Sequence, residues 1–149
     1  MGAARETVER WVELYNNGAI DELITMYGPD AVLVIPMGTV RGQGAIDDRL
    51  RGEHAAFSEA KVTARTWVED GDTVAVRYSF TARHTGPIPS PDGSDLVAGT
   101  GEQITFEGFA LYQMRDGKIV ANYRYFDQLP IALHLGLVAL TEPPATSDL

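Results

Sequence analysis

Hydrophobic residues in the first third of the chain recur at the spacing of helix faces. Apolar positions three or four residues apart predict helices over Ala3 to Asn17, Ile20 to Tyr27 and Gly44 to about Phe57. Gly28-Pro29-Asp30 is typical of the end of a helix, and it closes the second one. A short apolar run from Ala31 to Ile35 predicts a strand between the second and third helices.

The rest of the chain alternates between apolar and polar residues, which is the period of a strand with one buried face. We predict strands over Lys61–Glu69, Thr73–His84, Glu102–Met114 and Lys118–Asp127. The segment from Thr85 to Gly101 is rich in glycine and proline, and we expect it to form a long loop. Short turns containing Asp-Gly join the strands on either side of this loop into hairpins.

Helices gathered first and antiparallel strands after them are typical of an α+β domain, with the helices covering one face of a curved sheet. We expect one such domain over residues 1–140 and a flexible, proline-rich tail over residues 141–149. A curved sheet wrapped on helices tends to leave a cavity on its concave side. Apolar cavities of this kind are where small molecules bind.

The charge and the residue composition exclude several kinds of partner and ligand. The 149 residues carry a formal net charge of -9, and this field repels nucleic acids and anionic membranes. There is no cysteine, and the three histidines show no pairing at helical spacing, so we expect no metal site. No apolar stretch approaches the ~20 residues that a membrane-spanning helix needs, and the expected location is cytoplasmic.

Several segments together are similar to one known family. The chain resembles the SnoaL-like polyketide cyclases and ketosteroid-isomerase-like proteins of the nuclear transport factor 2-like superfamily. The resemblance runs to about Leu140 and is strongest around the second Asp-Gly hairpin. The segments that carry it are Val8–Gly18, Ile20–Tyr27, Pro29–Ala31, Ala82–Gly86, Met114–Val120, Tyr125–Leu129 and Leu135-Gly136.

The resemblance implies a cone-shaped fold in which three N-terminal helices pack on a strongly curved, mostly antiparallel sheet. It also implies a homodimer through the outer face of the sheet. The family's enzymes use acid–base groups deep in the cone to isomerise, cyclise or hydrolyse small hydrophobic molecules. We therefore expect a polyketide-, steroid- or terpenoid-type ligand and no cofactor. The alternative is a non-catalytic ligand-binding or association domain of the same fold.

The acid–base groups of the relatives are replaced in this chain. The strand acid of the cyclases and the second carboxylate of the epoxide hydrolases both match Arg124. Other catalytic positions of the three enzyme types match apolar or small residues, or a tyrosine one helical turn away. These positions are Gly108, Ala110, Trp11 or Tyr15, Ile35 and Phe80. None of the three catalytic sets is intact, so the resemblance predicts the fold rather than the reaction.

Arg124 is nevertheless a candidate catalytic residue, because a guanidinium stays charged and donates in pairs. Its position depends on the hairpin before it. A two-residue turn at Asp116-Gly117 would place Arg124 on the same face as Phe109, whereas a three-residue loop from Arg115 would place it opposite Gly108. The family pattern favours the second arrangement, in which the glycine leaves room for the arginine. An internal salt bridge is the structural alternative.

Three further side chains are candidate proton carriers. Asp127 could act as a base, although alternation places it opposite Arg124 and a helix-capping or solvated role is the alternative. His84 continues an apolar strand face and could either shuttle protons or hold the loop that follows. Tyr15, like Tyr78, could donate a hydrogen bond to a carbonyl.

The substrate pocket is predicted from the same alternation. Its walls should be flat and mostly apolar, with aromatic residues that also serve as core. The predicted lining is Trp11, Tyr27, Val34, Tyr78, Phe80, Phe106, Gly108, Ala110, Tyr112 and Phe126. A third possibility is that the outer face of the sheet recruits another protein; alternation places Arg65, Trp67, Arg77 and Tyr123 there.

Overall fold

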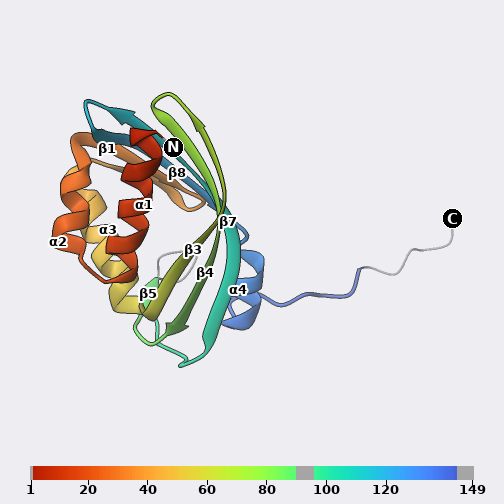
Figure 1. The fold of residues 1–149 in the computed structure, drawn as a ribbon. Helices are drawn as coiled ribbons and strands as arrows, with labels where there is room; N and C mark the ends of the chain where they lie inside the picture. Colours follow the sequence, from red (N-terminus) through yellow and green to blue (C-terminus); the bar gives the residue numbers. More distant parts are fainter. Residues whose placement is uncertain (1, 90–95, 144–149) are drawn as a thin grey trace, which may run out of the picture.

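Three helices with one apolar face each lie on one side of a bent sheet (Figure 1). The computed structural model describes residues 2–89 and 96–143. The helices are α1 (Ala3–Asn16), α2 (Ile20–Leu23), which a 3₁₀ turn η1 (Ile24–Met26) extends, and α3 (Gln43–Ala56). The predicted order of helix, helix, strand, helix and then strands is confirmed, and the fold is α+β.

The sheet has six strands in the order β2-β1-β8-β7-β4-β3. Strand β1 runs parallel to β8, and the other neighbours are antiparallel, so the sheet is mostly antiparallel as predicted. The strands are β1 (Tyr27–Ile35), β2 (Gly38–Arg41), β3 (Phe57–Asp70), β4 (Thr73–His84), β7 (Gln103–Arg115) and β8 (Lys118–Phe126).

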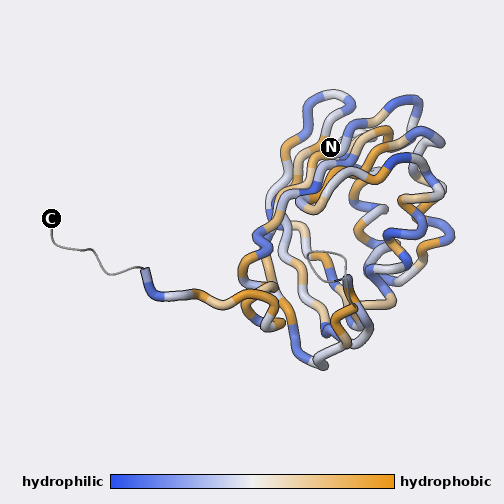
Figure 2. Tube along the Cα trace, turned by 180° about the vertical axis from the view of Figure 1, so that it is seen from behind, coloured by the Kyte–Doolittle hydropathy of each residue, from blue (hydrophilic) through white to orange (hydrophobic). Residues whose placement is uncertain are grey.

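The core lies between the helices and the concave face of the sheet. Buried side chains alternate along β4 and recur at helical spacing in α1, where Val8, Trp11 and Leu14 face the sheet. Hydrophobic and hydrophilic residues follow one another along the helices and strands (Figure 2). Both binary patterns therefore point to the same interior, which is why the sequence specifies this two-layer arrangement.

The structure corrects several predicted boundaries. β1 begins at Tyr27, so Gly28-Pro29-Asp30 belongs to a strand with an irregular register and is not a turn. Phe57 starts β3 instead of ending the third helix. Four short elements were not predicted: β2, a small hairpin of β5 (Ile88–Pro89) and β6 (Leu96–Val97), and helix α4 (Leu129–His134). Of the predicted tail, residues 144–149 lie outside the described residues.

A bulge in β3 reverses the predicted faces of its second half. The pairing with β4 shifts between Ala64 and Thr66, so that Trp67 lies opposite the buried Val76. Trp67 therefore packs against the core, while Val68 is 64% exposed. Trp67 does not belong to the outer face, where alternation had placed it.

A second bulge decides the position of Arg124. Arg115 pairs with Lys118 across a two-residue turn in which Asp116 and Gly117 both have positive φ. The register then shifts by one residue at Val120, and Arg124 lies opposite Ala110. Neither predicted hairpin holds in full: the turn has two residues, yet the bulge turns Arg124 to the concave face.

A carboxylate of a strand distant in sequence binds the N-terminus of the first helix. Glu69, at the end of β3, accepts hydrogen bonds of 2.7 Å from the backbone N–H groups of Gly2 and Arg5. The guanidinium of Arg5 lies 4.9 Å from the ring centre of Trp67 in the same strand. These contacts fix the start of α1 against the sheet, because the first N–H groups of a helix have no partner within it.

Candidate functional site

An arginine is buried between α1 and the sheet. The side chain of Arg124 rises from the concave face of β8, and the residue is 8% exposed. Its guanidinium lies 5.2 Å from the ring centre of Trp11 in α1, a distance typical of a cation–π contact. A buried charge requires a partner of opposite sign, and the third helix supplies it.

Glu53 of α3 is the partner of Arg124. Nη1 of Arg124 lies 3.1 Å from Oε1 and 3.3 Å from Oε2 of Glu53, and the two side chains are 10% and 14% exposed. Two further groups contact the same carboxylate. The hydroxyl of Tyr15 donates to Oε2 at 3.2 Å, and Nε of Arg49 lies 3.2 Å from Oε1. Helices α1 and α3 and strand β8 thus meet at one carboxylate.

Glu53 was missed in the sequence, although a signal for it exists. Ile46 and Leu50 are fully buried on the inner face of α3, and Glu53 follows Leu50 by three residues. That spacing places Glu53 on the same helix face. A carboxylate that continues an apolar stripe is a buried polar group, which is more informative than another apolar residue.

The surroundings keep Arg124 ionised. Burial by itself disfavours the charged guanidinium, but the negative charge of neighbouring acidic groups, above all the carboxylate of Glu53, outweighs it and raises the pKa of Arg124. Burial also raises the pKa of Tyr15 well above its ordinary value. Tyr15 therefore stays a hydrogen-bond donor at neutral pH, facing an anionic partner.

One edge of the Arg124 guanidinium has no hydrogen-bond acceptor in the part of the chain that the structure describes. Glu53 takes Nη1, whereas Nε and Nη2 of Arg124 are buried without a hydrogen-bond partner among residues 2–89 and 96–143. Buried donors are nearly always paired in folded proteins. These two nitrogens share the edge that binds planar acceptors in a fork, so the edge has the donor geometry to bind an oxygen-bearing group.

Beside Arg124 lies a network of hydroxyl, indole and amide groups. The hydroxyl oxygen of Tyr27 accepts hydrogen bonds of 3.0 Å from Nε1 of Trp11 and from Nδ2 of Asn122. Asn122 precedes Arg124 by two residues on β8 and is fully buried. Burial raises the pKa of Tyr27 and of Tyr112, so both phenols remain protonated near neutral pH.

Gly108 leaves room for a tyrosine and not for the arginine. A methyl group at Gly108 would lie 2.7 Å from the hydroxyl oxygen of Tyr78. Tyr78 pairs with Gly108 across β4 and β7, and its ring lies over the glycine. Burial raises the pKa of Tyr78, while the charge of Arg124 opposes that shift. The positive charge of Arg124 therefore acts on the hydroxyl of Tyr78.

A row of phenylalanines crosses the concave face beside these polar groups. Phe80 and Phe106 stack with ring centres 4.9 Å apart, and Phe106 and Phe126 stack at 4.7 Å. Phe57, which follows the end of α3, contacts Phe80 edge-on at 6.1 Å. Phe57, Phe106 and Phe126 are only half-buried. The row thus reaches from the core toward solvent and presents flat apolar surface.

The structure does not bring the other two candidate proton carriers to Arg124. His84 is fully buried, and its Nδ1 lies 3.3 Å from Oγ1 of Thr100 in the following loop. This geometry matches the loop-holding role, with more burial than the sequence indicated. Asp127 is exposed, and its Oδ1 accepts a hydrogen bond of 3.0 Å from the backbone N–H of Leu129 at the start of α4.

Most of the predicted pocket lining faces the interior, with one correction. On β1, Leu33 and Ile35 are buried in the core, and Val34 lies on the opposite face of the strand. The interior therefore takes Leu33 and Ile35 from this strand in place of Val34. The remaining lining residues are buried or half-buried on the inner side: Trp11, Tyr27, Tyr78, Phe80, Phe106, Gly108, Ala110, Tyr112 and Phe126.

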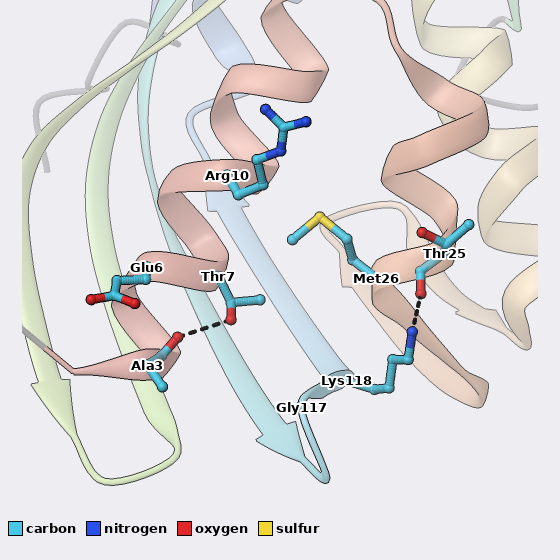
Figure 3. Close-up of a pocket in the computed structure, with 8 residues that line it drawn as sticks. All are labelled: Ala3, Glu6, Thr7, Arg10, Thr25, Met26, Gly117 and Lys118. Atoms are coloured by element: carbon cyan, nitrogen blue, oxygen red, sulfur yellow. Dashed lines mark hydrogen bonds between the residues drawn. The ribbon is translucent and has the colours of Figure 1, made fainter.

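Two open hollows on the described surface lie away from this interior. One, of about 440 Å³, lies beside the first turns of α1, where Lys118 donates to the carbonyl oxygen of Thr25 at 2.6 Å (Figure 3). The other, of about 460 Å³, lies on the outer face of the sheet, between Arg77, Phe109 and Tyr125. Neither hollow is lined by Arg124 or Glu53.

The described residues show neither a metal-binding cluster nor a membrane-spanning helix. Within residues 2–89 and 96–143, no group of three or more His, Cys, Asp or Glu side chains could hold a metal ion. In the same part of the chain, no helix combines the length and the apolar character needed to cross a membrane.

Comparison with known proteins identifies similar folds. The model of the SnoaL-like domain matches residues 8–122. AclR of Streptomyces galilaeus, described as a proposed hydroxylase, is 21% identical with a TM-score of 0.78, over 91% of this chain and 97% of that one. A proposed SnoaL-like polyketide cyclase of Jannaschia is 19% identical with a TM-score of 0.78, over 89% and 91%.

A third solved structure contains a small ligand. It is a protein of ketosteroid isomerase-like fold from Catenulispora acidiphila in complex with trimethylamine, 18% identical with a TM-score of 0.73, over 93% of this chain and 98% of that one. No curated protein matches the chain. At these identities the solved structures establish a nuclear transport factor 2-like fold and do not carry an activity across.

Proposed function

The chain belongs to the SnoaL-like domain family, and we propose that its interior binds and converts a small hydrophobic organic molecule by acid–base chemistry without a cofactor. The polyketide, steroid and terpenoid classes fit the flat apolar walls. The observation that carries the proposal is the buried Arg124–Glu53 pair, which joins a free guanidinium edge to a carboxylate in one apolar space. Such a pair can hold an oxygen and move a proton at once.

The proposed mechanism assigns separate roles to the two residues. Arg124 donates from Nε and Nη2 to an electron-rich oxygen of the substrate and stabilises negative charge there. Glu53 accepts a proton from a neighbouring C–H group, and the electron pair of that bond moves toward the oxygen. Return of the proton to another carbon gives isomerisation. Attack of the carbanion on a carbonyl carbon gives cyclisation, and the alkoxide that forms takes the proton back from Glu53. Tyr15 supports Glu53 through its hydrogen bond of 3.2 Å.

The phenylalanine row is the proposed binding surface for the apolar body. Phe80, Phe106 and Phe126 lie on the concave face that also carries Arg124. The partial exposure of Phe57, Phe106 and Phe126 indicates the side from which a molecule would reach the pair. Movement of these half-buried side chains would widen the approach to the pair, as in an induced fit.

The test is a thermal-shift screen of carbonyl-containing polyketides, steroids and terpenoids, followed by turnover assays on the compounds that bind. Glu53→Gln and Arg124→Gln should each lower turnover by about 100-fold or more. Asp48→Asn, on the exposed side of the same helix, is the matched control and should leave turnover unchanged. Unchanged turnover in both the Glu53 and the Arg124 variant would refute the proposed roles.

A non-catalytic role is the second candidate, and the ion pair between Arg124 and Glu53 favours it, because each charge already has a partner within the fold. A SnoaL-like domain of this kind can serve as a ligand-binding or association module. Binding without turnover of any bound compound would support this candidate over the enzyme.

We also propose that two copies of the chain pair through the outer face of the sheet. Phe109 and Tyr125 face each other across β7 and β8 and are 58% and 57% exposed. Arg77 and Glu107 lie at the same hollow, so the patch carries apolar surface with both signs of charge. A patch of this composition can be complementary to its own copy, as a two-fold interface requires.

A further inference from the structure

The charge balance at the buried pair is positive. Arg124 and Arg49 both contact Glu53, at 3.1 and 3.2 Å, so two guanidinium groups share one carboxylate. No second carboxylate pairs with either arginine in residues 2–89 and 96–143. His54 lies next to Glu53, with Nε2 3.0 Å from the carbonyl oxygen of Tyr15, and it adds no negative charge in either protonation state.

The free edge of Arg124 has the shape of a carboxylate receptor. Glu53 binds at Nη1, which leaves Nε and Nη2 together on one side of the planar group. A neutral carbonyl offers one oxygen to these donors. A carboxylate offers two oxygens at the matching spacing and supplies the missing negative charge as well. Shape and charge therefore select the same chemical group.

We propose that the natural ligand is a hydrophobic organic acid whose carboxylate docks on the Nε–Nη2 edge of Arg124. Its apolar body would lie along Phe80, Phe106 and Phe126. The inference rests on the proposed function and deepens it, because it assigns the oxygen that Arg124 binds to an anion already present in the ligand. Arg124 then anchors and orients the molecule, and proton transfer is left to Glu53 with Tyr15.

The two guanidinium groups at Glu53 differ in exposure. The side chain of Arg49 is 33% exposed, that of Glu53 14% and that of Arg124 10%, so Arg49 is the guanidinium nearer to solvent. Its charge adds to that of Arg124 in attracting a carboxylate. Glu53 competes for the same donors and repels the ligand, so its removal should tighten the binding of an acid.

The experiment compares acids with neutral esters of the same shape. Isothermal titration calorimetry on the purified full chain measures 2-naphthoate, abietate and their methyl esters at pH 7. We expect each acid to bind at least about tenfold more tightly than its ester, since one bidentate charged pair is exchanged for a single neutral acceptor. The preference should weaken as salt is added.

Variants locate the effect at the receptor. Glu53→Gln should tighten acid binding severalfold, and Arg49→Gln should weaken it, with little change for the esters. Arg124→Lys should remove most of the acid preference, because an ammonium cannot bind both oxygens in a fork. Arg51→Gln is the matched control: Arg51 lies on the same helix but pairs with Asp47 and Asp21 at the surface, and both ligand types should bind it unchanged.

The outcomes separate this inference from the proposed function. Esters or neutral carbonyl compounds that bind as tightly as the acids, with no gain in Glu53→Gln, would overturn the carboxylate assignment and leave the hydrophobic-ligand proposal standing. The absence of binding by any acid, ester or neutral compound of the screen would overturn both. If Arg124→Lys does not fold, the wild-type acid-to-ester ratio and the Glu53 and Arg49 variants still decide between these outcomes.

Discussion

Two groups of neighbouring strands approach Gly108 so closely that only a residue without a side chain fits there. A methyl group there would lie 2.7 Å from the hydroxyl oxygen of Tyr78 and 2.9 Å from the backbone oxygen of Tyr125. The tyrosine could shift, but the backbone oxygen belongs to the neighbouring strand and cannot. At the scale of the residue, the absence of a side chain at Gly108 thus leaves the space that the ring of Tyr78 occupies.

Gly108→Ala is therefore expected to destabilise the protein by about 1–3 kcal/mol, the usual cost of overpacking a close-packed interior. Urea denaturation followed by circular dichroism measures the change in the free energy of unfolding. Gly52→Ala is the matched control: Gly52 lies within α3, and a methyl group there would meet no atom within 4 Å. That change should stabilise the protein by about 0.5–1 kcal/mol. Equal stability of both variants would contradict the role given to Gly108.

Arg124 was predictable as a candidate residue, and its partner was predictable only in part. An arginine in an otherwise apolar strand pattern is conspicuous in any sequence. Glu53 continues the stripe of Ile46 and Leu50 on α3, but its direct neighbours Gly52 and His54 do not mark a buried position, so its face is clear only once the helix is placed. The distance between Glu53 and Arg124 depends on tertiary packing across 71 positions of the chain, which no local pattern encodes.

Between elements, Glu69 links the end of β3 to the start of α1. Two backbone N–H groups, those of Arg5 and Gly2, donate to its carboxylate and lower its pKa from the ordinary value of 4.5. The folded protein thus binds this proton less tightly than the unfolded chain. The contribution to stability is present above pH 4.5 and is lost as the pH falls through the lower folded pKa.

We predict that Glu69→Gln lowers the melting temperature at pH 7 and reduces the loss of stability on acidification to about pH 3. Thermal unfolding by circular dichroism at both pH values measures the effect. Glu107→Gln, which alters an exposed carboxylate of β7, should retain the acid sensitivity of the wild-type protein. An identical acid response in Glu69→Gln and wild type would show that the cap carries no pH-dependent stability.

The elements with a strong period were predictable, and the short or irregular ones were not. The α1 and β4 boundaries follow from 14 and 12 residues of consistent patterning. β1 was predicted too short because Gly28-Pro29 reads as a turn, yet the strand continues through it with a shifted register. Helix α4 has six residues and a proline in its first turn, too few for a periodic signal.

Across the whole molecule, helices cover the concave face of the sheet, and the outer face carries exposed aromatic residues. We predict that the purified chain is a dimer with twice the mass of 16.2 kDa. Lysine at both Phe109 and Tyr125 should yield a monomer, because like charges would meet across a two-fold axis. Size-exclusion chromatography with light scattering measures the mass of each variant.

Asp48→Lys serves as the control for this change. Asp48 is exposed on α3, on the side of the sheet opposite to the outer face, so the mass of this variant should equal that of the wild-type protein. A wild-type monomer, or a lysine double variant that remains a dimer, would reject the outer face as the interface.

The extra residue at Val120 has an evolutionary consequence. With a regular ladder after the Asp116-Gly117 turn, Tyr123 and Tyr125 would face the helices and Arg124 would face water. Deleting Val120 would leave a regular hairpin with the arginine still opposite Ala110, so a shorter lineage could keep this chemistry. If the bulge were straightened at constant length, the residues after it would exchange the concave and outer faces of β8 with no change in the amino-acid sequence. The number of residues between the Asp116-Gly117 turn and Arg124, together with the bulge, therefore decides which face of the sheet carries the guanidinium.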